Sequence, residues 1–130
     1  LRDAVAHLRA IGREEHIDLI YFGGVRSGTD AAKLIGLGAK AVAYGVALAL
    51  AAGGTITNGV IEFGSDRTQQ DRVDAMQQLL QANGGEASMM ARCTGKTRLH
   101  NIEPEDLRSV TLAATAQLGV ELTGTRQVTP

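Results

Sequence analysis

The 130-residue sequence has little cysteine, few aromatic side chains and no excess of charge of either sign. Its one cysteine, Cys93, excludes an internal disulfide, and no cysteine pair is present to hold zinc or an iron–sulfur cluster. Thirteen basic and fourteen acidic residues give a net charge of −1, which removes the general electrostatic case for nucleic acid as a partner. No apolar run is long enough to span a bilayer, and no signal-peptide pattern opens the sequence, so we expect no membrane association and a cytoplasmic protein.

Glycine, in contrast, is abundant, with 16 residues. In the first part of the sequence, glycines follow short apolar segments and separate them from segments with helical spacing. The predicted order is helix 1–12, strand 17–22, helix 31–37, strand 40–44 and helix 46–52. Strands that alternate with helices predict a parallel sheet in which each strand is buried on both faces. Ser27 or Thr29 is expected to cap the second helix.

The pattern changes after residue 54. Asn58-Gly59 between β-branched residues indicates a hairpin. A long polar helix follows, with its cap expected at residues 64–66 and an interruption at Gly84-Gly85. Pro104 is expected in a first helical turn, and residues 107–118 carry the apolar spacing of one last helix that ends at Gly119. Cys93 lies on an apolar helical face and is expected to be a core thiol.

The turn at residues 23–30 is the strongest candidate for a binding site. Glycine permits positive φ and close approach to a phosphate, and a helix N-terminus supplies N–H donors and partial positive charge. Arg26 could add a guanidinium group and Ser27 a hydroxyl. The turn is neither a Walker loop nor a G-x-G-x-x-G fingerprint. A tight strand-to-helix turn that binds nothing is the alternative.

A second glycine turn, at residues 44–46, follows the next strand. Both turns fall at the carboxyl ends of parallel strands, where α/β proteins bind ligands, and in barrels two such turns hold a phosphate jointly. Neither His7 nor His16 has a partner at metal-ligand spacing, so no metal site is predicted, and no catalytic residue is assigned. His100 could act as a base or a ligand. His100, in a polar connector, is expected to be a capping or surface residue. The predicted cofactor-binding residues are Gly23, Gly24, Arg26, Ser27, Gly28, Tyr44, Gly45 and Val46.

Residues 17–54, IDLIYFGGVRSGTDAAKLIGLGAKAVAYGVALALAAGG, resemble the last two strand–helix units of FMN-binding (β/α)8 barrels, in particular the synthase domain of glutamate synthase. Residues 89–108, MMARCTGKTRLHNIEPEDLR, resemble the C-terminal end of short glutamate synthase-related proteins, including a subunit of N-methylglutamate synthase. The resemblance implies an α/β fold in which residues 1–54 are the C-terminal portion of a TIM barrel. Residues 55–130 would then form a hairpin-like insertion and a helical C-terminal extension that packs on the barrel.

The same resemblance implies an FMN-dependent oxidoreductase that makes glutamate from 2-oxoglutarate and ammonia, together with other subunits of a complex. The FMN phosphate would lie on the two glycine turns. Glutamate synthases carry a cysteine cluster for a [3Fe–4S] centre after the eighth strand. Residues 55–64 contain no cysteine, so no iron–sulfur cluster is expected from this segment.

Two alternatives stay open. One is a subunit of N-methylglutamate synthase, in which methylamine replaces ammonia, and the other is a non-catalytic assembly module that docks through the long polar helix. A (β/α)8 barrel needs about 250 residues. We therefore expect this chain to be a C-terminal fragment that alone binds FMN weakly or not at all and catalyses nothing.

Overall fold

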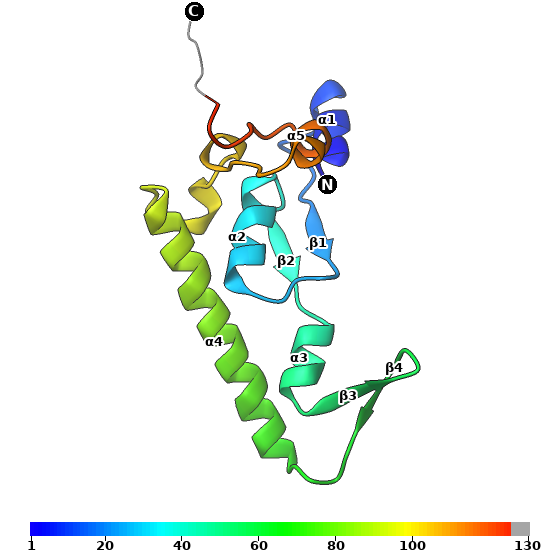
Figure 1. Cartoon of the computed structure of the whole chain (residues 1–130). Helices are drawn as coiled ribbons and strands as arrows, with labels where there is room; N and C mark the ends of the chain where they lie inside the picture. Colours follow the sequence, from blue (N-terminus) through cyan, green and yellow to red (C-terminus); the bar gives the residue numbers. More distant parts are fainter. Residues whose placement is uncertain (126–130) are drawn as a thin grey trace, which may run out of the picture.

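The computed structural model describes residues 1–125, and residues 126–130, the end of the expected extension, lie outside this range. The described chain is a mixed α/β structure with two small sheets (Figure 1). Its elements are α1 (Arg2–Ala10), β1 (Ile20–Phe22), α2 (Gly28–Gly36), β2 (Ala41–Ala43), α3 (Val46–Ala51), β3 (Gly54–Thr57), β4 (Val60–Phe63), α4 (Gln69–Cys93), the 3-10 turns η1 (Leu99–Asn101) and η2 (Pro104–Asp106), and α5 (Leu112–Leu118). No helix in this range is long and apolar enough to cross a membrane.

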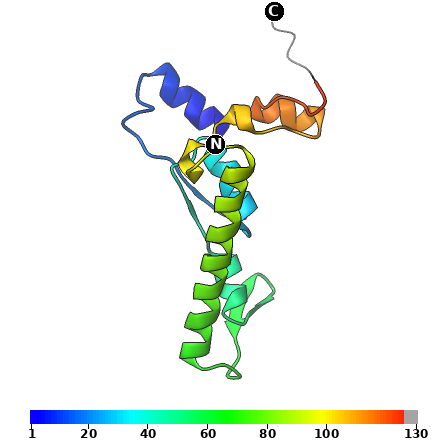
Figure 2. The same ribbon diagram turned by 90° about the vertical axis from the view of Figure 1, so that its left-hand side faces the viewer.

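Helix α4 runs along the molecule and organises it. Its first half packs beside α3, and its second half packs beside α2 and η1 (Figure 1). Near the C-terminal end of α4, helices α1 and α5 extend to opposite sides when α4 faces the viewer (Figure 2). The start of α1 meets the end of α5, where Arg2 Nε donates a hydrogen bond to the carbonyl of Leu118 at 3.0 Å.

Strands β1 and β2 form the predicted parallel pair, in which Tyr21 lies opposite Val42. Helix α2 packs beside the pair, as the strand–helix alternation predicts. The prediction of strands buried on both faces is wrong for the described chain, since Ile20 and Phe22 are 68% and 74% exposed. The side chains of one strand alternate between faces, so these two lie on the same face of β1, and the rest of residues 1–125 leaves both largely exposed. Two strands do not close into a barrel, and no barrel is formed by these residues.

Local signals correctly predicted two features. Ser27, and not Thr29, caps α2, because its hydroxyl oxygen accepts a hydrogen bond from the backbone N–H of Asp30 at 3.1 Å. The Asn58-Gly59 hairpin joins β3 to β4, and both turn residues have positive φ, at 51° and 80°. Such values are those that two-residue hairpin turns require.

Helix α4 differs from its prediction in two ways. It begins after Thr68, which forms a capping box with Asp71, and not at residues 64–66. It also continues without interruption through Gly84-Gly85. Each glycine costs about 1 kcal/mol relative to alanine in a helix. Packing offsets this cost, because Asn83 and Ala87 on either side of the glycine pair are buried.

The predicted last helix is split. Pro104 begins the short turn η2, and α5 begins only after Thr111, so the prediction of one helix over 107–118 is wrong. Between them, Ser109 leaves helical geometry and pairs with residues 121–123, donating its N–H to Glu121 and accepting from the N–H of Thr123, both at 2.8 Å. The end of α5 at Gly119, with φ of 63°, is as predicted.

The core is small and consists mainly of alanines. Ala32 of α2, Ala91 of α4 and Ile102 form its centre. Cys93 is exposed, so the prediction of a core thiol is wrong. The buried positions of α4 recur every four residues, at Asn83, Ala87 and Ala91. A residue two positions beyond Ala91 therefore lies on a different side of the helix.

Candidate functional site

The turn between β1 and α2 is built on two glycines in the left-handed region. Gly23 has φ of 112° and Gly24 has φ of 69°, conformations that side chains rarely adopt. A Cβ at either position would have no atom within 4 Å, so backbone conformation and not crowding calls for glycine here. The turn therefore presents its backbone to open space at the carboxyl end of β1.

The turn after β2 lies close to the first turn. Gly45 precedes α3, and a Cβ on it would lie 3.3 Å from two atoms of the Phe22 ring. The ring of Phe22, at the end of β1, thus lies across Gly45. This contact brings the two glycine turns together, as expected for the ends of adjacent parallel strands.

Five predicted site residues line one hollow of about 720 Å³, which is the size of a small-molecule site. They are Gly23, Gly24, Arg26, Gly45 and Val46. The remaining lining is apolar and includes Phe22, Leu50 and Leu79. Sequence reasoning did not single out Phe22, although its place directly before Gly23-Gly24 marks the strand end. It also missed Leu79, because nothing local indicates that α4 reaches this hollow.

The other three predicted residues have structural contacts away from the hollow lining. Ser27 caps α2 with its hydroxyl, and its carbonyl accepts a hydrogen bond from the Tyr44 hydroxyl at 3.1 Å. Gly28 donates its N–H to Oε2 of Glu86 at 2.8 Å. A Cβ on Gly28 would lie 2.6 Å from the backbone N of Ala87, so glycine here permits the close approach of α2 and α4.

Arg26 is tied to Asp30 at the edge of the hollow. Its backbone N–H and its Nε both donate to Oδ2 of Asp30, at 3.2 Å and 3.3 Å. The Arg26 side chain is nevertheless 81% exposed. Exposed ion pairs contribute little free energy, so this pair is a weak competitor for an anion that reaches the guanidinium group.

Two side chains near the turn have shifted pKa values. Burial raises the pKa of Tyr44, which keeps its hydroxyl protonated as a donor to Ser27. Hydrogen bonds from the Thr29 hydroxyl and then from the Gly28 N–H lower the pKa of Glu86. Glu86 is therefore a carboxylate at neutral pH.

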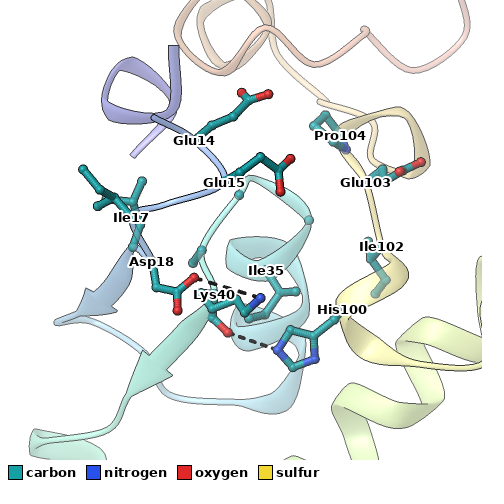
Figure 3. Close-up of a pocket in the computed structure, with 14 residues that line it drawn as sticks. Glu14, Glu15, Ile17, Asp18, Ile35, Lys40, His100, Ile102, Glu103 and Pro104 are labelled. Carbon is teal, nitrogen blue, oxygen red and sulfur yellow. Dashed lines mark hydrogen bonds and ion pairs between the residues drawn. The ribbon is translucent and has the colours of Figure 1, made fainter. Parts of the chain in front are cut away.

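A second hollow, of about 340 Å³, lies at the opposite ends of the strands (Figure 3). Asp18 precedes β1 and Lys40 precedes β2. Nζ of Lys40 lies 4.0 Å from Oδ1 of Asp18. The exposed His100 ring contacts the carbonyl of Lys40 through Nε2 at 3.0 Å, which agrees with its expected surface role. Ligands of α/β proteins bind at the carboxyl ends of strands, so the glycine turns are the better candidate. Residues 1–125 contain no group of three or more His, Cys, Asp or Glu side chains that could hold a metal ion.

Comparison with known proteins gives one informative relative. The chain is 36% identical over 154 aligned residues to a "Glutamate synthase large subunit-like protein" of Rhizobium meliloti (strain 1021). This chain is similar to a glutamate synthase-like protein. The alignment covers 96% of the chain but only 35% of the relative, so this chain spans about a third of the length of that protein. No family model and no solved structure matches the chain.

Proposed function

We propose that this chain supplies the phosphate-binding end of an FMN site in a glutamate synthase-like oxidoreductase, which makes glutamate from 2-oxoglutarate and ammonia. One observation carries the proposal. Two glycine turns, at the carboxyl ends of the adjacent parallel strands β1 and β2, line the same hollow. The similarity to a glutamate synthase large subunit-like protein supports the class of enzyme.

The residues around the hollow suit a phosphate ester with a ring system. The open backbone at Gly23 and Gly24, the exposed guanidinium of Arg26 and the turn at Gly45 would hold the phosphate. The apolar wall that includes Phe22 and Leu50 suits a ring. Bound FMN supplies the redox chemistry, and this chain's residues bind and orient it.

The exposed face of the small parallel sheet supports a barrel setting. In a (β/α)8 barrel, inward-facing side chains of every strand fill the interior. Ile20 and Phe22 are apolar, lie on one face of β1 and are exposed in this chain. We propose that residues 1–54 are the last two units of such a barrel and residues 55–130 an extension that packs on it. The relative is about three times as long as the part that this chain spans.

One observation keeps a second function in view. Residues 55–64, where glutamate synthases hold their cysteine cluster, form the hairpin β3–β4 and contain no cysteine. This departure favours a divergent relative such as a subunit of N-methylglutamate synthase, which uses methylamine. One incubation of the natural polypeptide that carries this chain contains 2-oxoglutarate, ammonia and a two-electron reductant. The other contains glutamate and methylamine, whose exchange would release ammonia. Mass spectrometry of the new product in each incubation separates the two. N-methylglutamate supports the second function, and glutamate supports the first.

The phosphate site is tested with FMN and riboflavin, which differ by the phosphate group. In the natural polypeptide that carries this chain, labelled with ¹⁵N-glycine, we expect FMN to shift the amide signals of Gly23, Gly24 and Gly45, and riboflavin at the same concentration to leave them in place. Gly24→Asp should abolish the FMN response, because a carboxylate would repel the phosphate. Gly24→Asn is the matched control, since Asn tolerates positive φ and is neutral. Equal responses to FMN and riboflavin, or none to FMN, argue against the site.

An assembly role makes a different prediction for the same variant. If the chain only docks other subunits, Gly24→Asp should leave their association unchanged and FMN should never be retained. Co-purification of the natural polypeptide with its partners, followed by flavin absorbance, measures both properties in one sample.

A further inference from the structure

The N-terminus of α2 is occupied by a side chain that comes from α4. The N–H of Gly28 donates to Oε2 of Glu86 at 2.8 Å, and the hydroxyl of Thr29 donates to Oε1 of the same carboxylate. These are donors that an anion at this helix end would use. The contact joins residues 58 positions apart and is therefore a tertiary contact, not a local cap.

Close packing holds Glu86 in this position. A Cβ on Gly28 would lie 2.6 Å from the backbone N of Ala87, the residue that follows Glu86. Asn83, one turn earlier on α4, is 7% exposed, and Ala87 is 4% exposed. The backbone that carries Glu86 is thus fixed against the start of α2.

Two carboxylates of this chain already supply negative charge at the N-terminus of α2. Helix N-termini attract negative charge. Asp30 lies in the first turn of α2, and Glu86 adds a second carboxylate. A further anion here would meet these charges with the Gly28 and Thr29 donors already taken. On the other side of the turn, Gly23 and Gly24 face open space.

We propose that Glu86 is a specificity-determining residue that keeps anions away from the N-terminus of α2 and confines a phosphate ligand to the Gly23–Gly24 side of the turn. The identity of that ligand as the FMN phosphate rests on the proposed function. The exclusion itself rests on the contacts of Glu86 with Gly28 and Thr29. Gly28, a predicted cofactor-binding residue, is thereby assigned to the packing of α2 on α4.

The test titrates inorganic phosphate into the ¹⁵N-labelled full chain and follows the amide signals of Gly28 and Thr29. In the wild type, these signals should not shift in a saturable way. In Glu86→Ala, both signals should shift in a saturable way. The apparent Kd for phosphate should be at least about tenfold lower than any apparent Kd in the wild type. Asp74→Ala is the matched control, because it removes one exposed carboxylate from the same helix. It should behave as the wild type.

Equal responses of Gly28 and Thr29 in wild type and Glu86→Ala overturn the proposal, as does no response in a folded Glu86→Ala chain. A measurement on the wild type covers the case in which Glu86→Ala does not fold. The ¹³C signal of the Glu86 carboxyl carbon should stay in place during the phosphate titration, and a saturable shift would show that phosphate displaces it.

The two proposals fail separately. If Gly28 responds to phosphate only in Glu86→Ala, while Gly23 and Gly24 respond to FMN in no variant, Glu86 excludes anions but the proposed FMN site is wrong. If Gly23 and Gly24 respond to FMN, and Gly28 responds to phosphate alike in all variants, the FMN site stands and the role of Glu86 is wrong.

Discussion

The hydroxyl of Tyr44 donates a hydrogen bond to the backbone carbonyl of Ser27 across 3.1 Å, and so ties the end of β2 to the residue that caps α2. Tyr44 was predicted as a ligand contact, and the structure gives its hydroxyl a backbone partner. The bond links the two glycine turns that line the hollow. It therefore helps to set the spacing between the parts of the proposed site.

Tyr44→Phe should remove this link without changing the shape of the ring. We expect a loss of about 1 kcal/mol in the free energy of unfolding, because Ser27 loses a partner for its carbonyl. Urea denaturation followed by circular dichroism measures it. Tyr21→Phe is the control, since the Tyr21 hydroxyl makes no hydrogen bond within residues 1–125. Equal losses in the two variants would contradict the assigned role.

Gly28→Ala and Gly85→Ala should change stability in opposite directions. The new Cβ at position 28 would press on the backbone of α4, which should cost about 1–3 kcal/mol. At position 85 in α4, a Cβ meets nothing within 4 Å, so alanine should stabilise the helix by about 0.5–1 kcal/mol. Paired urea midpoints give the comparison, and a destabilised Gly85→Ala would mean that α4 is bent or open at this point.

Glu86 should make stability fall in acid. Its pKa is lower in the folded chain than in the unfolded chain, because Thr29 and Gly28 donate to the carboxylate. The stabilisation is therefore present above the ordinary pKa of Glu, about 4.3, and is lost as the pH falls through the lowered folded pKa. Urea midpoints from pH 7 to pH 3 should fall more steeply for the wild type than for Glu86→Gln. Parallel curves would count against the contact.

Cys93 should react readily with a maleimide in the native state. It ends α4 and is exposed, in contrast to the expected core thiol. Mass spectrometry should find a single adduct within minutes at neutral pH, at a rate that urea changes little. If labelling required unfolding, Cys93 would be buried in the native chain, and the exposed position would be wrong.

Features fixed by neighbouring residues could be predicted from the sequence. Asn58-Gly59 defines a hairpin through its own backbone preferences, and Ser27 caps α2 by accepting the N–H of Asp30, three positions later. The two glycine turns likewise follow from local strand ends. Features fixed by contacts between distant residues could not be predicted. Helix α4 passes through Gly84-Gly85 because α2 packs on it.

The candidate site divides in the same way. Gly23, Gly24 and Gly45 are recognisable because the backbone conformation or a strand end calls for glycine. The contact between Glu86 and Gly28 spans 58 positions and has no local signal. The pairing of Ser109 with residues 121–123 is likewise a contact that apolar spacing along a helix does not reveal.

The strands of the parallel pair have only three residues each. An open edge of such a strand offers an incoming chain a very short row of hydrogen-bonding groups, and short edges are one way in which natural sheets resist adding foreign strands. The apolar side chains of Ile20 and Phe22 would favour self-association, but the backbone next to them gives a growing aggregate little to template on. We therefore expect any self-association of this chain to occur through apolar side chains and to be reversible. We do not expect the ordered fibril growth that long open strand edges promote.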